Sequence, residues 1–138
     1  MGCDFVEIKN YEDKYLVSLN ELLQKCFKVE RKCDVLDSDV EVLAVIDDKV
    51  VGYLVLNYLY DSLKDKKYYH VNYVCTDPEY RNQGIAKEMF SYVFQLCIKN
   101  DISYLELTSR PSRVAAQGLY RKLGFVERET TVFRKEIK

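Results

Sequence analysis

The stretch of sequence that decides the fold is VNYVCTDPEYRNQGIAKEMF, residues 71–90. Residues 68–76 are rich in Tyr and Val, which predicts a strand, and residues 85–99 carry apolar side chains at helical spacing. The loop between them brings Gly84 to the start of the helix, where unpaired backbone N–H groups and a partial positive charge can face an anion such as a pyrophosphate. Arg81 adds a formal charge beside them. A glycine at a helix start is also common in an ordinary tight turn, so the loop alone leaves both interpretations open.

The segments on either side predict strands and helices in alternation. The last of these helices has a start signal at Pro111-Ser112, with Ser112 as N-cap, and a stop signal at Gly124. A short second helix is allowed after residue 27. The order predicts one mixed α/β domain over residues 1–138. The other expected elements are strands at 5–9, 41–46, 50–60, 103–108 and two within 126–137, helices at 11–27 and 111–124, and a hairpin turn at Asp47-Asp48-Lys49.

Composition limits the class of protein. The chain has 138 residues, 48% hydrophobic and 31% charged, which suits one globular domain that needs neither metal nor disulfides. The 21 Lys and Arg residues against 22 Asp and Glu leave a net charge of -1, which argues against a nucleic-acid partner. No apolar run reaches the roughly 20 residues that cross a bilayer, so no membrane partner is expected.

Cysteine and histidine usage indicates a cytoplasmic protein without a metal site. The cysteines are widely spaced and form no C-x-x-C pair, and His70 is the single histidine. The Met1-Gly2 start resembles an acylated N-terminus, but Val6 stands where the myristoylation pattern requires Ser or Thr. Asp4 and Glu7 interrupt any apolar region, so no signal peptide is expected. The cysteines are Cys3, Cys26, Cys33, Cys75 and Cys97.

Two segments together resemble the GCN5-related N-acetyltransferase (GNAT) superfamily. The family's acyl-CoA-binding signature is R/Q-x-x-G-x-G/A, and Arg81, Gly84 and Ala86 fill its defined positions. Its second hallmark, A-x-x-L-Y-x-K-x-G-F, resembles residues 116–125, AQGLYRKLGF. The resemblance covers nearly the whole chain. It implies a single-domain α/β fold with a mixed, mostly antiparallel sheet of about six to seven strands and about four helices, whose central strands splay apart to form a CoA cleft.

The resemblance also implies a site for acetyl-CoA, the co-substrate. The main chain of residues 74–76 would pair with the pantetheine arm, backbone N–H groups of residues 82–86 would hold the pyrophosphate, and Tyr120 would protonate the departing thiolate. A phenol with a pKa near 10 is a credible acid for a thiolate whose pKa is near 8.5. Arg113 stands where relatives often have Asn, and it is either a phosphate ligand or a solvated helix residue. The implied cofactor-binding residues are Val74, Cys75, Thr76, Arg81, Asn82, Gln83, Gly84, Ile85, Ala86 and Arg113.

The general base is not evident from the sequence. Many relatives carry a Glu on the central strand where this chain has Asn72, and an amide cannot act as a base. His70 lies on the same face of that strand by period two and titrates in a useful range, and Glu106 is a second candidate. A lone His is more often a structural or surface residue than a base, and the same holds for Glu106. The proton can also leave directly to solvent.

The sequence therefore predicts a cytoplasmic, acetyl-CoA-dependent N-acetyltransferase that transfers an acetyl group to a primary amine by direct attack in a ternary complex. The acidic run of Asp34, Asp37, Asp39 and Glu41 favours a small cationic acceptor if it faces the site, whereas most such runs are solvated loops. We expect a monomer or homodimer. The alternatives are a CoA-binding regulatory module without catalysis and a peptide or protein N-terminal acetyltransferase.

Overall fold

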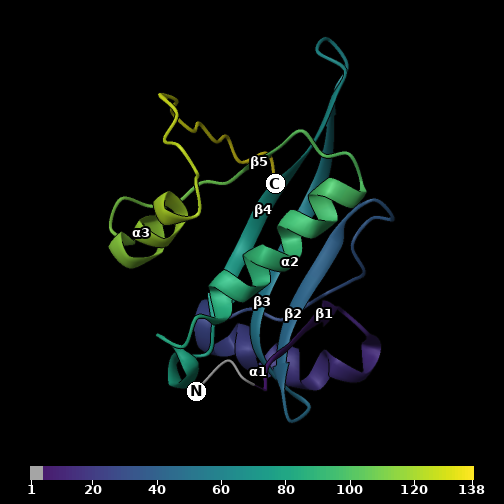
Figure 1. Ribbon diagram of the computed structural model, residues 1–138, viewed down its shortest axis with the longest axis vertical. Coiled ribbons are helices and arrows are strands. Elements are labelled where there is room, and N and C mark those ends of the chain that lie inside the picture. The colour runs from purple at the N-terminus through teal and green to yellow at the C-terminus, as the bar shows by residue number, and fades with distance from the viewer. Residues whose placement is uncertain (1–4) are drawn as a thin grey trace. The chain divides into compact units, whose positions relative to one another are not determined.

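The computed structural model describes residues 5–138, which form two compact units that divide between Thr108 and Ser109. Residues 1–4, with the Met1-Gly2 start and Cys3, lie outside the described residues. The first unit is a sheet with two α-helices, and the second carries one α-helix (Figure 1). No helix among residues 5–138 is long and apolar enough to cross a membrane.

The first unit is built on one mixed sheet of five strands, in the order β1-β2-β3-β4-β5. Neighbouring strands are antiparallel except β4 and β5, which are parallel. The chain between β4 and β5 contains a long helix, as a parallel connection requires. The strands are β1 (Glu7–Asn10), β2 (Val40–Ile46), β3 (Lys49–Asp61), β4 (Lys66–Thr76) and β5 (Tyr104–Glu106).

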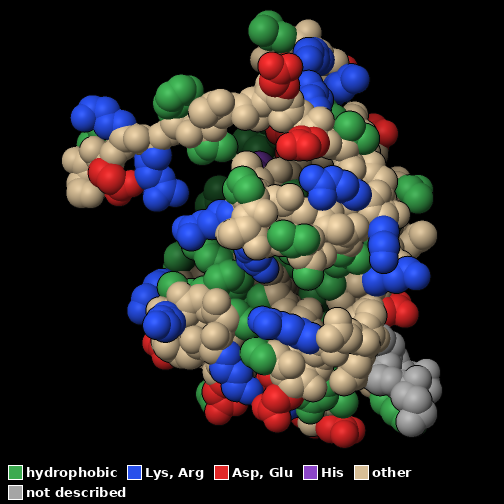
Figure 2. All heavy atoms as spheres, turned by 90° about the vertical axis from the view of Figure 1, so that its left-hand side faces the viewer, with side chains coloured by type: hydrophobic (Ala, Val, Ile, Leu, Met, Phe, Trp, Pro, Cys, Tyr) green, Lys and Arg blue, Asp and Glu red, His purple; other side chains and the backbone are tan. Residues whose placement is uncertain are grey.

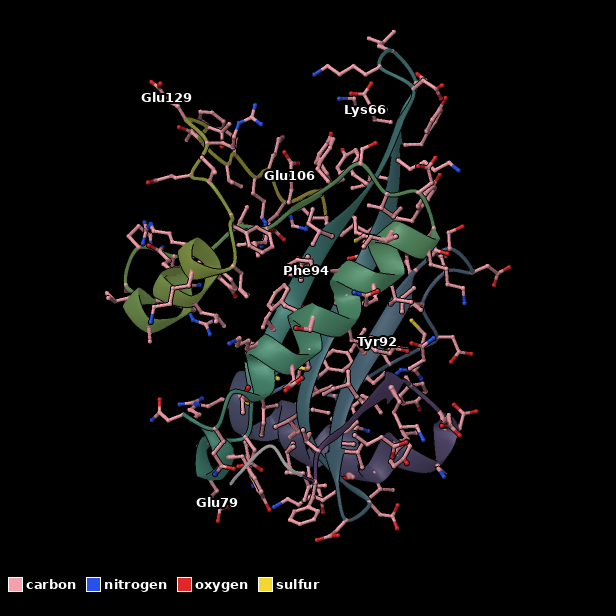
Figure 3. The ribbon with its side chains drawn as sticks, viewed as in Figure 1. Lys66, Glu79, Tyr92, Phe94, Glu106 and Glu129 are labelled. Atoms are coloured by element: carbon pink, nitrogen blue, oxygen red, sulfur yellow. The ribbon has the colours of Figure 1, made fainter. Side chains whose placement is uncertain are left out.

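The predicted hairpin between β2 and β3 is confirmed. Asp47 and Asp48 form its turn, both with positive φ (48° and 62°). That is the backbone of a type I′ turn, whose twist matches the twist of the flanking strands. The next hairpin, between β3 and β4, is longer, and Lys66 marks its far end in Figure 3.

The two helices of the first unit cover opposite faces of the sheet (Figure 1). α1 (Leu16–Phe27) follows a short 3-10 turn, and α2 (Ile85–Lys99) begins and ends where the sequence predicts. Gly52 brings α2 close to β3, because a Cβ there would lie 3.1 Å from both Ile85 Cγ2 and Met89 Cε. The core between α1 and the sheet consists of Tyr15, Leu19, Leu22, Leu23, Leu43, Val45, Val50, Tyr53, Val55 and Cys75.

Two parts of the predicted fold are wrong. The segment 126–137, predicted as two strands, contains no strand, so the sheet has five strands rather than six to seven. Its few apolar residues lie among charged and polar ones and remain exposed (Phe133 is 90% exposed), so no apolar face holds the segment in a sheet. The structure also has three α-helices rather than four. The chain after α1 leaves the helix at Lys28, which has φ 56°, and does not form the second helix.

The second unit contains α3 (Val114–Lys122). The residue at its N-cap is Arg113, which makes no side-chain cap hydrogen bond, so the predicted capping role of Ser112 is wrong. The predicted stop at Gly124 is confirmed: its φ is +95°, and the Phe125 N–H donates to the Tyr120 carbonyl at 2.9 Å. The Phe125 ring packs edge-on against the Tyr120 ring, with centroids 5.8 Å apart.

Candidate cofactor and acceptor site

One edge of β4 is left open over half its length. β5 pairs with β4 only at Tyr68, Tyr69 and His70, whereas β4 continues to Thr76. Over residues 71–76, β4 is paired with β3 on its other edge, and no described strand pairs with the edge that β5 leaves. Main-chain groups on such an edge are available to an extended ligand, as they are to an added strand. The open edge includes Val74, Cys75 and Thr76.

A β-bulge lies at the start of this open edge. The register between β3 and β4 passes from Val55–Asn72 to Tyr53–Cys75, so Tyr73 and Val74 together oppose one residue of β3. Tyr73 has φ 55°, a conformation that a bulky side chain rarely adopts. A bulge bends its strand and redirects the side chains that follow, and here it turns Cys75 into the core beneath α1.

The loop after β4 is anchored by a buried carboxylate. Asp77 is 1% exposed, and it accepts hydrogen bonds from the Glu79 N–H and from Lys25 Nζ of α1, each at 3.0 Å. Burial alone would raise the pKa of Asp77, but these two bonds and the charges of Lys25 and Lys49 together outweigh burial, and the pKa is lowered. Glu79 marks this end of the sheet in Figure 3, opposite Lys66. The carboxylate therefore fixes the path of the chain into α2.

The start of α2 offers backbone N–H groups without a competing side chain. Gly84 is the N-cap residue with φ 77°, and no side chain caps the helix. Asn82 also has positive φ (64°), so the loop turns twice before the helix begins. Successive N–H groups at such a turn and helix start form a concave surface suited to an anion. Arg81 and Asn82 are exposed, Gln83 and Ala86 are half-buried, and Ile85 is buried in the core.

Cys26 is a candidate residue that sequence reasoning missed, since its position in α1 suggested only a small apolar side chain. Its sulfur lies 3.8 Å from the Thr76 carbonyl, at the end of the open edge. A hydrogen bond with Cys75 lowers the pKa of Cys26 to about 7, and the charge of Arg81 acts in the same direction. Cys97, by contrast, is half-buried, and this partial burial alone raises its pKa to about 11.

These values predict selective alkylation. At neutral pH about half of Cys26 is thiolate, whereas almost none of Cys97 is. Iodoacetamide should therefore modify Cys26 at least tenfold faster than Cys97, as followed by peptide mass spectrometry. The rate at Cys26 should fall as the pH drops below about 7. Equal rates at the two residues would contradict the assignment, and Cys26→Ser provides the control for peptide identity.

His70, Asn72 and Glu106 lie on one face of the sheet, the face that α1 partly covers. His70 and Asn72 are two residues apart on β4, and His70 is opposite Glu106 of β5. Asn72 is opposite Val55, which belongs to the α1 core. Glu106 is exposed, and Figure 3 labels it on β5. These three predicted residues are therefore brought together where the open edge begins.

The acidic run does not form one free negative surface. Glu41 is 5% exposed and receives two hydrogen bonds from Arg31, at 2.8 and 2.9 Å, and one from the Tyr53 hydroxyl at 2.7 Å. Arg31 also bonds Asp34 at 3.0 Å. Asp39 accepts hydrogen bonds from β3. Most of the run thus fixes the loop after α1, and sequence spacing alone gave no sign of this.

The two remaining predicted residues lie in the second unit. Arg113 is exposed at the N-cap of α3. Tyr120 is 9% exposed on the same helix, and burial raises its pKa, with the charge of Arg113 acting in the opposite direction. A Cβ at Gly118 would meet no described atom within 4 Å, so packing does not require this glycine.

No metal centre is present among residues 5–138, in which no group of three His, Cys, Asp or Glu side chains is placed to hold a metal ion. The face drawn in Figure 2 carries Lys and Arg side chains scattered among acidic and hydrophobic ones.

The fold is shared with solved acetyltransferases. An aminoglycoside acetyltransferase from an uncultured soil metagenomic sample, in complex with sisomicin, superposes with a TM-score of 0.84 at 16% identity and covers 98% of each chain. A ribosomal-protein-alanine N-acetyltransferase from Brucella melitensis biovar Abortus 2308 superposes with a TM-score of 0.78 at 16% identity, over 94% of this chain and 99% of that one. At these identities the likeness concerns the fold alone.

Sequence comparison identifies the family. A putative [ribosomal protein bS18]-alanine N-acetyltransferase of Bacillus subtilis (strain 168) is 39% identical over 51 residues, which are 37% of this chain and 34% of that protein. The match thus spans about a third of that relative's length. The model of the Acetyltransferase (GNAT) family matches residues 7–125. The chain therefore belongs to the GNAT family of acetyltransferases, as its two sequence motifs predicted.

Proposed function

We propose that the chain, as a single domain over residues 1–138, transfers an acetyl group from acetyl-CoA to a primary amine by direct attack in a ternary complex. The observation that carries this proposal is the junction of β4 and α2. There a strand edge along which no strand of residues 5–138 runs ends at a helix start without a side-chain cap, so one extended ligand can use both. Membership of the GNAT family supports acetyl-CoA as that ligand.

In this proposal the first unit holds the co-substrate mainly through its main chain. The open edge at Val74, Cys75 and Thr76 pairs with the amide groups of pantetheine. Backbone N–H groups of residues 82–86 donate hydrogen bonds to the pyrophosphate oxygens, and Arg81 supplies a positive charge. Arg113 of α3 is proposed to contact a further phosphate.

The chemical step joins the amine nitrogen to the thioester carbonyl carbon and breaks the carbon–sulfur bond. We assign the protonation of the leaving thiolate to Tyr120, because the raised pKa of this buried phenol keeps it protonated at neutral pH. The proton lost by the amine passes either directly to water or to a side chain that acts as a base. His70 and Glu106 are the candidate bases. Asn72 cannot take this proton.

The acceptor is proposed to be a small cationic amine. The exposed carboxylate of Glu106, on the same face as His70 and Asn72, supports this, and so does the similarity in fold to an aminoglycoside acetyltransferase. A peptide N-terminus is the second candidate, favoured by the partial match to a ribosomal-protein-alanine N-acetyltransferase. The four described cysteines form no disulfide, which supports the reducing cytoplasm as location.

A panel of amines tests both candidates. Sisomicin, spermidine and a short peptide that begins with alanine are each incubated with acetyl-CoA and the protein, and CoA and acetylated product are quantified by mass spectrometry. We expect product and CoA in equal amounts from one class of amine. Acetyl-CoA binding by calorimetry without product from any amine would instead favour the CoA-binding regulatory module, and no binding would contradict both.

A further inference from the structure

A chain of hydrogen bonds connects a carboxylate to the open edge of β4. Asp39 Oδ1 accepts from the Tyr58 backbone N–H at 2.8 Å, and Asp39 Oδ2 accepts from Asn57 Nδ2 at 3.2 Å. Asn57 Oδ1 in turn accepts from Asn72 Nδ2 at 2.7 Å. All three side chains are half-buried, and Asn72 lies just past the point where β5 stops pairing with β4. We call these three side chains the amide relay.

The carboxylate fixes the direction of every amide in the relay. An ionised carboxylate only accepts hydrogen bonds, so Asn57 must turn its NH₂ group toward Asp39 and its carbonyl oxygen toward Asn72. Asn72 must then turn its own NH₂ group toward Asn57. Its carbonyl oxygen, Oδ1, is consequently turned away from Asn57 and accepts no hydrogen bond from any of residues 5–138.

We propose that Asn72 Oδ1 accepts a hydrogen bond from an N–H group of the acceptor amine. Asp39 is then the positioning residue that keeps this oxygen turned away from Asn57. The inference rests on the proposed function, because it assigns a role at the same site. A primary amine or ammonium group has N–H donors that can bond to the carbonyl oxygen of Asn72. If Asn72 presented its NH₂ group instead, two donors would face each other and no hydrogen bond would form. Asn72 orients the nitrogen through this bond and takes no proton from it.

The role of Asp39 follows from what its amide counterpart would do. In Asp39→Asn the Tyr58 N–H cannot become an acceptor, so the new side-chain oxygen stays with it and the new NH₂ group faces Asn57. The Asn57 amide then turns over to present its oxygen, and Asn72 turns over in response. The isosteric substitution thus reverses the relay and brings an NH₂ group of Asn72 to the outward position. No atom is added or removed at Asn72 itself.

The chain offers a matched control for the lost charge. Asp37 lies two residues away in the same loop and is exposed. Asp37→Asn removes the same charge from the same segment and leaves the relay intact. The probes are butylamine, which carries N–H donors at neutral pH, and butyltrimethylammonium, which has the same charge and no N–H.

Side-chain amide NMR and ligand titration in the presence of CoA test the inference. In wild type and Asp37→Asn, the Asn72 NH₂ protons should exchange slowly with water because they bond to Asn57, and in Asp39→Asn they should exchange rapidly. The Kd of butylamine should rise about tenfold in Asp39→Asn only, the loss expected for a half-buried hydrogen bond to a charged group. The Kd of butyltrimethylammonium should be equal in the two variants.

Several results would overturn the inference. These are unchanged Asn72 exchange in Asp39→Asn, equal weakening of butylamine by both variants, or failure of butylamine to bind the wild-type protein. Calorimetry with acetyl-CoA on the same samples separates the two proposals. If acetyl-CoA binds normally and the relay is unaltered in Asp39→Asn, the positioning role alone is refuted. If acetyl-CoA does not bind to the wild-type protein, the proposed function is refuted.

Discussion

Replacing Tyr120 by phenylalanine is expected to lower kcat by about a hundredfold to ten-thousandfold, the range in which general acid catalysis contributes. The substitution removes one oxygen from a buried ring and keeps its packing against Phe125. The Kd of acetyl-CoA should therefore stay within about twofold of the wild-type value. Steady-state turnover with the acceptor found in the amine panel, together with calorimetry, measures both quantities.

The pH dependence of kcat tests the general-acid role of Tyr120 independently. A general acid acts in its protonated form, and burial raises the pKa of Tyr120 above its ordinary value of about 10. Activity should therefore persist to alkaline pH and decline only above that value, and this decline should be missing in Tyr120→Phe. The matched control is Tyr92→Phe on α2. This substitution removes a hydroxyl group that donates a hydrogen bond to Asn10 Oδ1 of β1 at 2.7 Å. Unchanged kcat in Tyr120→Phe would refute the general-acid role.

Replacing Gly84 by alanine is expected to weaken acetyl-CoA binding by about tenfold or more. Gly84 has φ 77° at the N-cap of α2, where a Cβ costs roughly 1–2 kcal/mol. The loop relieves that strain by changing its backbone, and the N–H groups proposed to hold the pyrophosphate then lose their common direction. Calorimetric titration with acetyl-CoA, below the melting transition of the variant, measures the effect.

A second glycine supplies the control for this experiment. Gly124 has φ +95° at the end of α3, so Gly124→Ala introduces comparable backbone strain in the second unit and leaves the sequence of the α2 loop unchanged. Both variants should lose stability in thermal unfolding, but only Gly84→Ala should lose affinity for acetyl-CoA. Equal loss of affinity in both variants would show that strain in general, rather than the α2 loop, governs binding.

Local sequence signals were sufficient for much of the fold and for the loop that leads into α2. The spacing of apolar residues after Gly84 gave both ends of α2, and Asp47-Asp48 gave the turn of the first hairpin. These elements depend on residues that are close in sequence. The prediction of two strands in residues 126–137 failed because it also relied on local sequence alone. A strand needs a neighbouring strand and an apolar face as well.

The features found around the open edge of β4 depend on residues far apart in sequence. Nothing local signals that Tyr73 adopts positive φ in a bulge, or that Cys26 of α1 lies beside the carbonyl of Thr76. The same holds for the amide relay, in which Asp39 meets Asn57 across a hairpin. Spacing identified Asp39 as a charge, whereas the fold shows it as a hydrogen-bond acceptor with defined partners.

Amide hydrogen exchange with and without acetyl-CoA tests the central claim, that the co-substrate lies along the open edge of β4 and ends at the start of α2. Acetyl-CoA should slow exchange at the N–H groups of residues 74–76 that face the open edge and at those of residues 82–86. Exchange in the β1–β2 pair, which lies at the opposite end of the strand order from β5, should not change. Slowing confined to other segments, with none at β4 or the α2 loop, would contradict the account.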